Sequence, residues 1–160
     1  GLSYHDAGPG PDLSAFKEVI ETFRETAHTP SRCVYDKVIC DSNSKPERDF
    51  ALYADNDHEI VCFLKLPDFY EIPTPIGNYR PDFGLVMKRK SLITGDESDY
   101  SFVIEVKSTP NLDDMTALTF SEQFKIKCAR EYFKALGIPA DIRYMAPVAD
   151  YRRDFKNKVI

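Results

Sequence analysis

The sequence predicts an α/β fold with a small mixed β-sheet flanked by helices. Three segments carry apolar residues at helical spacing, namely residues 12–30, 41–57 and 119–136. Short runs rich in β-branched and aromatic residues, which are typical of strands, lie between and after these segments. A chain of 160 residues without internal repeats is expected to fold as one domain.

The boundaries of the elements follow from the residues that end or cap them. The glycine- and proline-rich residues 1–11 are expected to be a linker or a remnant left by excision of the domain, which spans residues 12–160. Pro30 ends the first helix, Ser44 is expected to cap the second and Gly137 follows the third. The predicted strands are residues 32–40, 58–67, two strands within 69–90 joined by a turn at 76–78, then 100–108 and 140–148. Residues 149–160 are predicted to form a basic tail.

The composition argues against several classes of protein. No run approaches the roughly 20 apolar residues of a membrane helix, so no membrane association is expected. The four cysteines form no C-x-x-C pair and the three histidines are isolated, which disfavours a zinc site or a disulfide framework. Reduced, buried cysteines indicate a cytoplasmic location. The formal charge of −5 argues against strong non-specific binding of nucleic acid by this chain alone.

An acidic residue stands directly after a proline in NYRPDFGLV, at the start of an apolar strand. In the later strand SFVIEVK, alternation of side chains places Glu105 and Lys107 on one face at the carboxyl end. If the two strands are neighbours, Asp82 and Glu105 can hold a hard divalent cation, and Mg²⁺ suits such oxygen ligands, with Mn²⁺ as a substitute. Lys107 would then neutralise charge at a phosphate or orient the attacking water. The set predicts metal-assisted hydrolysis of a phosphodiester.

The same residues also fit simpler roles. A Pro-Asp dipeptide is common in turns and a Glu-x-Lys pair is common on a solvated strand, which is compatible with an α/β domain without a site. Glu47 shares a helical face with Phe50, Ala51 and Ala54, so it is expected to point inward as a third acid. In the SKPE motif Glu47 also fits a capping box, in which it accepts from the backbone N–H of Ser44. These two roles are compatible with each other.

A basic stripe follows the predicted helix 119–136. Lys127, Arg130 and Lys134 recur at steps of three and four, and Lys125 lies nearer the apolar boundary, directed toward the sheet edge. Such a stripe is also typical of a solvated helix face. As a DNA-contacting surface, these four side chains would bind phosphates. Such contacts position the protein on the duplex but do not recognise the base sequence.

Around these residues the sequence resembles the PD-(D/E)xK nuclease superfamily, with Pro81-Asp82 as the first part of the motif and Glu105 to Lys107 as the second. The runs FLKLPDFYEIPTPIGNYRPDFGLV, FVIEVKST and FKIKCAREYF are similar to the endonuclease domain at the C-terminus of the restriction subunit of type III restriction enzymes. This resemblance extends from about Tyr35 to Phe133.

The resemblance implies a restriction-endonuclease-like core and Mg²⁺-dependent cleavage of double-stranded DNA by a single endonuclease domain, residues 12–160. Asp82 and Glu105 would ligate the metal, Lys107 would assist the water, and Glu47 would complete the site as a helical glutamate. A helicase-like motor upstream in the natural chain and a modification (methyltransferase) subunit are the implied partners. ATP would act only through that motor, because this chain contains no G-x-x-x-x-G-K-[ST] motif. Two alternatives remain: a repair or recombination nuclease of the same superfamily, and a catalytically degenerate module that binds DNA or docks a partner.

Overall fold

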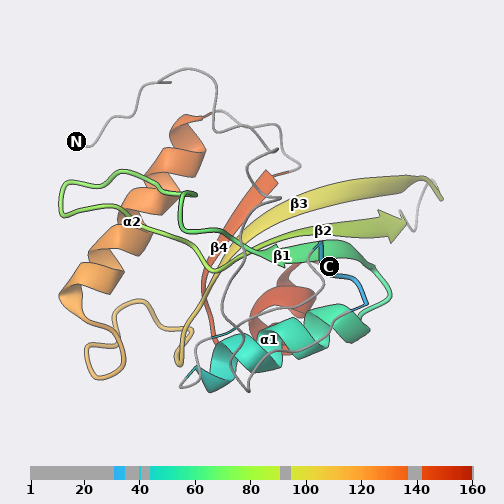
Figure 1. The fold of residues 1–160 in the computed structure, drawn as a ribbon, viewed down its shortest axis with the longest axis horizontal. Coiled ribbons are helices and arrows are strands. Elements are labelled where there is room, and N and C mark those ends of the chain that lie inside the picture. The colour runs from blue at the N-terminus through green and yellow to red at the C-terminus, as the bar shows by residue number, and fades with distance from the viewer. Residues whose placement is uncertain (1–30, 35–39, 41–43, 91–94, 137–141, 160) are drawn as a thin grey trace.

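The computed structural model describes the greater part of the chain (Figure 1). The described residues are 31–34, 40, 44–90, 95–136 and 142–159. The elements are α1 (Lys45–Asn56), β1 (Ile60–Lys65), β2 (Phe83–Lys90), β3 (Glu97–Val106), α2 (Phe120–Ala135), β4 (Ile142–Val148), a π-helical turn η2 (Tyr151–Phe155) and a 3₁₀ turn η3 (Lys156–Lys158). The predicted linker 1–11, the predicted helix 12–30 and most of the predicted strand 32–40 lie outside the described residues.

The four strands form one mixed sheet in the order β1-β2-β3-β4. Strands β1, β2 and β3 are antiparallel neighbours, and Phe83 lies opposite Ile104 in the β2–β3 pair. Strand β4 runs parallel to β3, with Val103 opposite Tyr144. Parallel neighbours require a crossover connection, and α2 lies in that connection. The predicted α/β class with a small mixed sheet is confirmed.

The main core lies on the face of the sheet that α1 covers. Alternate residues of β2 and β3 point into it, as the strand pattern predicts; they are Phe83, Leu85, Met87, Phe102, Ile104 and Val106. Phe50 of α1 stacks on Phe83 with ring centroids 5.2 Å apart. Burial of each aromatic ring of this kind stabilises the fold by about 1.5–3 kcal/mol.

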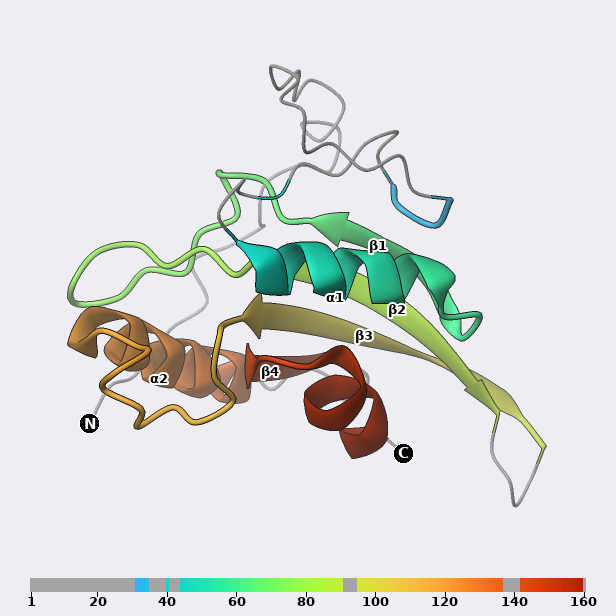
Figure 2. The same ribbon diagram turned by 90° about the horizontal axis from the view of Figure 1, so that it is seen from below.

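The last residues of the chain complete this core, which corrects the expectation of a basic tail. Figure 2 shows η2 (red) directly after β4, and η2 also contacts α1. Phe155 is fully buried, with its ring centroid 5.9 Å from Phe50 and 5.1 Å from Phe102. Tyr151 and Val159 are buried as well. These three apolar residues recur every fourth position, a helical spacing that the surrounding charges obscure in the sequence.

The opposite face of the sheet packs against α2. Ile126 of this helix joins Leu112 and Leu118 in one cluster, and Ala129 joins Ile72 and Tyr79 in another. A complete capping box between Thr119 and Glu122 caps the helix, which begins at Phe120, one residue after the predicted start.

One predicted strand does not form. Of the two strands expected within residues 69–90, only β2 is present. The other segment makes a single antiparallel bridge between Ile72 and Tyr79, because Pro73 and Pro75 lack the N–H groups that a longer ladder requires. Gly77 turns this loop at φ 104°, a conformation that favours glycine.

Two expectations from composition can be compared with the structure. All four cysteines are free, with Cys40 and Cys128 buried and Cys33 and Cys62 half-buried. Among the described residues, no helix is long and apolar enough to cross a membrane.

Candidate active site at the edge of the sheet

The structure brings Asp82, Glu105 and Lys107 together where β3 ends and β2 begins. Because the two strands are antiparallel neighbours, the residue before β2 lies beside the last residues of β3. The Asp82 N–H donates to the carbonyl of Ile104 at 3.1 Å, and Asp82 Oδ2 accepts from the N–H of Val106 at 2.8 Å. The condition that the sequence left open, that the two strands be neighbours, is therefore met.

Glu105 is a buried carboxylate, only 4% exposed. Its Oε1 forms an ion pair with Lys107 Nζ at 3.0 Å, and its Oε2 accepts from Tyr79 Oη at 2.8 Å. The hydroxyl of Tyr79 is in turn 2.6 Å from that of Tyr144 on β4. Burial raises the pKa of Glu105, although Lys107 and Tyr79 both favour its charged form. Both oxygens of this side chain are thus held in fixed positions.

Asp82 carries a strongly perturbed carboxyl group. Burial raises its pKa to about 8, and repulsion from Glu105 and Glu47 contributes. In the described part of the chain, only one of its two oxygens, Oδ2, has a hydrogen-bond donor. A carboxylate with an unpartnered oxygen, close to two further acids, is a group whose charge a divalent cation would stabilise.

The donor set fits a hard cation. Asp82 and Glu105 offer oxygen atoms, and Mg²⁺ commonly binds through one or two carboxylates together with waters and a phosphate. Within the described ranges, no group of three His, Cys, Asp or Glu side chains lies close enough to hold a metal ion by itself. The arrangement therefore fits a two-carboxylate site completed by water or substrate better than a fully protein-ligated one.

Glu47 points toward the same edge of the sheet, as its helical face predicts. Its side chain is 13% exposed and forms an ion pair with Lys65, the last residue of β1. The capping box is not observed, because Ser44 makes no side-chain capping hydrogen bond and the carboxylate of Glu47 contacts Lys65 instead. Burial lowers the pKa of Lys65, but Glu47 and Asp82 more than offset this effect and the pKa is raised. The nearby Cys40 thiol has a pKa raised by burial to about 11, so it remains protonated.

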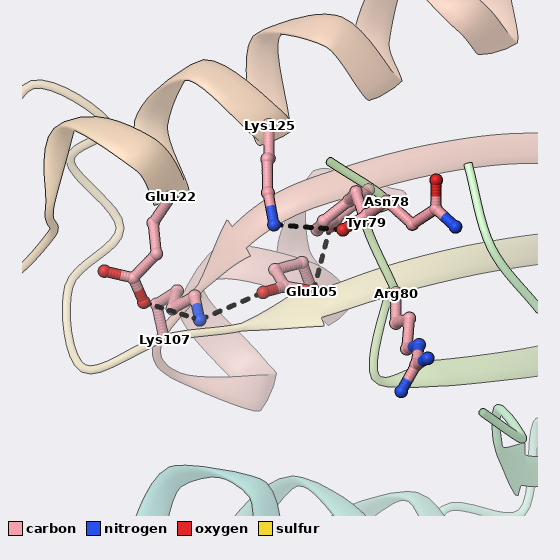
Figure 3. Close-up of a pocket in the computed structure, with 7 residues that line it drawn as sticks. All are labelled: Asn78, Tyr79, Arg80, Glu105, Lys107, Glu122 and Lys125. Atoms are coloured by element: carbon pink, nitrogen blue, oxygen red, sulfur yellow. Dashed lines mark hydrogen bonds and ion pairs between the residues drawn. The ribbon is translucent and has the colours of Figure 1, made fainter. Parts of the chain in front are cut away.

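Lys107 lies between two carboxylates (Figure 3). Its Nζ is 3.0 Å from Glu105 Oε1 and 3.0 Å from Glu122 Oε1 of α2. Burial lowers the pKa of Lys107, but the two carboxylates raise it by more. The lysine is therefore a stable cation, suited to neutralising negative charge rather than to accepting a proton.

A pocket of about 330 Å³ opens over Glu105 and Lys107. Its other lining residues are Asn78, Tyr79, Arg80, Glu122 and Lys125 (Figure 3). Lys125 Nζ donates to the carbonyl of Asn78 at 2.9 Å, so this side chain does reach the sheet edge. The pocket therefore places Glu105 and Lys107 beside the cationic side chains of Arg80 and Lys125, whereas Asp82 and Glu47 do not line it.

The other three residues of the predicted basic stripe lie away from this pocket. Each contacts a group of the domain itself: Lys127 is 3.5 Å from Asp113 Oδ1, Arg130 donates to the carbonyl of Ala146 at 2.6 Å, and Lys134 is 3.9 Å from Glu131 Oε2. These contacts lie at the surface and leave the side chains accessible.

Three residues of the site were not predicted from the sequence: Lys65, Tyr79 and Glu122. Glu122 carried a detectable signal, because the TFSE run at the helix start fits a capping box. The other two are recognisable only through their distant partners, Glu47 for the lysine and Glu105 for the tyrosine.

A mixed sheet with flanking helices, with two carboxylates and a lysine at one strand edge, has the architecture of a restriction-endonuclease-like domain. A family model described as an endonuclease domain matches residues 31–156, and the chain belongs to this family. Membership indicates nuclease activity. No curated protein and no solved structure shows significant similarity to the chain.

Proposed function

We propose that this domain hydrolyses phosphodiester bonds of double-stranded DNA in a metal-dependent reaction, as the cleavage domain of a type III restriction enzyme. The observation that carries the proposal is the juxtaposition of Asp82, Glu105 and Lys107 at adjoining strand ends, with Glu105 and Lys107 lining an open pocket. The endonuclease family supports the nuclease class. The similarity of the IPTPIGNYRPDF and KIKCA runs to type III restriction subunits supports the narrower assignment.

Each residue has a role that its environment supports. Asp82 and Glu105 would hold Mg²⁺, or Mn²⁺ in its place, and Glu47 of α1, which is paired with Lys65, would add negative charge near them. A bound cation of this kind polarises the phosphate and makes an attacking water more acidic. The permanently charged Lys107 would stabilise the negative charge that develops on the phosphate, and Tyr79 would keep Glu105 in position.

DNA would be held by phosphate contacts. Lys125 enters the pocket directly, and Lys127, Arg130 and Lys134 extend the basic surface along α2. The formal charge of −5 disfavours tight binding by the domain alone. An upstream helicase-like motor that uses ATP, and a methyltransferase subunit that selects the sequence, would deliver the DNA in the cytoplasm.

A DNA-binding module without catalysis is the second candidate function. The ion pair between Glu47 and Lys65 favours it, because this pair engages an acid that would otherwise be available to a cation. Metal binding separates the two candidates.

The test is calorimetric titration of Mn²⁺ and Mg²⁺ into the chain, with and without a short DNA duplex, followed by cleavage of supercoiled plasmid. Asp82→Asn and Glu105→Gln remove one proposed ligand each, and Asp99→Asn changes an exposed carboxylate of β3 as the matched control. We expect both site variants to abolish metal binding and plasmid nicking, with the control unaffected. Equal metal binding by wild type and the double site variant, even with DNA, would refute the catalytic proposal and favour the binding module.

A further inference from the structure

The two carboxylates that pair with Lys107 belong to different elements of the fold. Glu105 precedes Lys107 on its own strand, whereas Glu122 belongs to the first turn of α2. Both carboxylates approach the lysine Nζ to 3.0 Å. The lysine side chain is 24% exposed, so it contacts the pocket and is still largely enclosed.

The two oxygens of Glu122 have separate partners. Oε2 accepts from the backbone N–H of Thr119 at 2.9 Å and from its hydroxyl at 2.8 Å, while Thr119 Oγ1 accepts from the N–H of Glu122 at 3.3 Å. Oε1 faces Lys107. The capping box thus fixes the orientation of the carboxylate, and the remaining oxygen is directed at the lysine (Figure 3).

The helix cap does not explain the second contact. A glutamine at this position completes a capping box as well as a glutamate does, because only one oxygen atom is required. A negative charge also suits the N-terminus of a helix, but neither the cap nor the helix dipole requires the second oxygen of Glu122 to face Lys107. The lysine provides the reason, because its other partner is Glu105, whose oxygens the proposed function assigns to a cation.

We propose that Glu122 is a positioning residue that holds the Lys107 ammonium group in the site from the helix side, so that Glu105 is free to bind the cation. This inference rests on the proposed function. A cation on Glu105 would weaken its attraction for the lysine, and the lysine would then move toward solvent without a second anchor. Glu122 supplies that anchor and lies outside the proposed ligand set.

Two variants separate positioning from capping. Glu122→Gln retains an oxygen for Thr119 and removes the charge that faces Lys107. Thr119→Val removes the capping hydroxyl, retains the backbone donor to Glu122 and leaves the charge in place. A Lys107→Met variant identifies the signal of the lysine.

The first readout is the proton–nitrogen NMR signal of the Lys107 ammonium group, which is sharp only when ion pairs slow its motion and its exchange with water. We expect this signal in wild type and in Thr119→Val, with Mg²⁺ absent or present. In Glu122→Gln we expect it to weaken without Mg²⁺ and to disappear with Mg²⁺. A sharp, unshifted signal in Glu122→Gln under both conditions would overturn the proposal.

The second readout is single-turnover DNA cleavage. We expect Glu122→Gln to lower the rate about 10- to 100-fold, the usual effect of losing an outer contact that orients the residues of a metal site, with DNA affinity unchanged. An unchanged rate would overturn the positioning role. Wild type that neither cleaves DNA nor binds either cation would refute the proposed function instead, and the metal-free NMR comparison would still decide whether Glu122 holds Lys107.

Discussion

The carboxyl group of Asp82 is expected to destabilise the metal-free domain, so that Asp82→Asn should raise the free energy of unfolding. Burial, followed by repulsion from Glu105 and Glu47, raises the pKa of this group from 3.8 to about 8. In the wild type, Asp82 Oδ2 accepts a hydrogen bond from the N–H of Val106 at 2.8 Å. Asparagine removes the ionisable group and still presents an oxygen to this N–H. The substitution therefore tests the charge with little change in shape or hydrogen bonding.

The size of the effect follows from the two pKa values. An acid whose pKa is higher in the folded than in the unfolded state stabilises the fold at low pH and loses that contribution as the pH rises to the folded pKa. For Asp82 the free energy of unfolding should fall between about pH 4 and about pH 8, by at most ~1.4 kcal/mol per pH unit. Summed up to about pH 7, this loss in the free energy of unfolding is at most about 4 kcal/mol. Since the side chain is half-buried and water can reach it, we expect about 1–3 kcal/mol.

Urea unfolding without divalent cations measures this gain. Wild type, Asp82→Asn and the exposed control Asp99→Asn are compared near pH 5 and near pH 7. The gain of Asp82→Asn should be larger near pH 7, and the control should show none. Added Mg²⁺ should stabilise wild type more than Asp82→Asn, because a ligand that binds only the folded state adds to its stability. A variant less stable than wild type at both pH values would refute the reasoning.

Three further substitutions test contacts around the core, each by urea unfolding. Tyr79→Phe removes the donor to the buried carboxylate of Glu105 and should cost about 1–3 kcal/mol; no loss would show that water replaces the hydroxyl. Phe155→Ala should cost about 3–5 kcal/mol, and a loss below about 1 kcal/mol would exclude the C-terminal turn from the core. Lys156→Met removes the partner 2.6 Å from Asp57 and should cost about 1–3 kcal/mol at neutral pH. Burial raises the pKa of Asp57, but its hydrogen bonds lower this pKa by more. The stabilisation from the ion pair is therefore lost as the pH falls below about 4. A difference in stability between wild type and Lys156→Met that persists in acid would contradict the ion-pair account.

Local patterns in the sequence were sufficient to place the central residues of the site. A strand alternates its side chains between two faces, so the face of Glu105 and Lys107 follows from the position of the apolar residues Phe102, Ile104 and Val106. The inward direction of Glu47 followed in the same way from the apolar face of its helix. These inferences depend only on neighbours within one helix or one strand.

The features that were missed depend on contacts between distant parts of the chain. Tyr79 lies in an irregular loop, and its hydrogen bond spans 26 residues to Glu105. Lys65 ends a strand, where a lysine is ordinarily solvated, and only the fold brings it to Glu47. The C-terminal segment was misjudged because its charged residues outnumber Tyr151, Phe155 and Val159, the three side chains that pack in the core. The composition of a segment does not determine its burial, because burial depends on the parts of the chain against which the segment packs.

The position of Phe155 also constrains how the chain can acquire its fold during synthesis. The antiparallel strands β1, β2 and β3 can pair as soon as they leave the ribosome, because their connections are local. Their apolar face remains incomplete until η2 emerges, after β4 and its crossover through α2. A nascent chain that stops before Tyr151 would therefore present Phe102 to solvent and be prone to aggregation or chaperone capture. This face of the sheet is therefore completed only by a segment that follows all four strands in the chain.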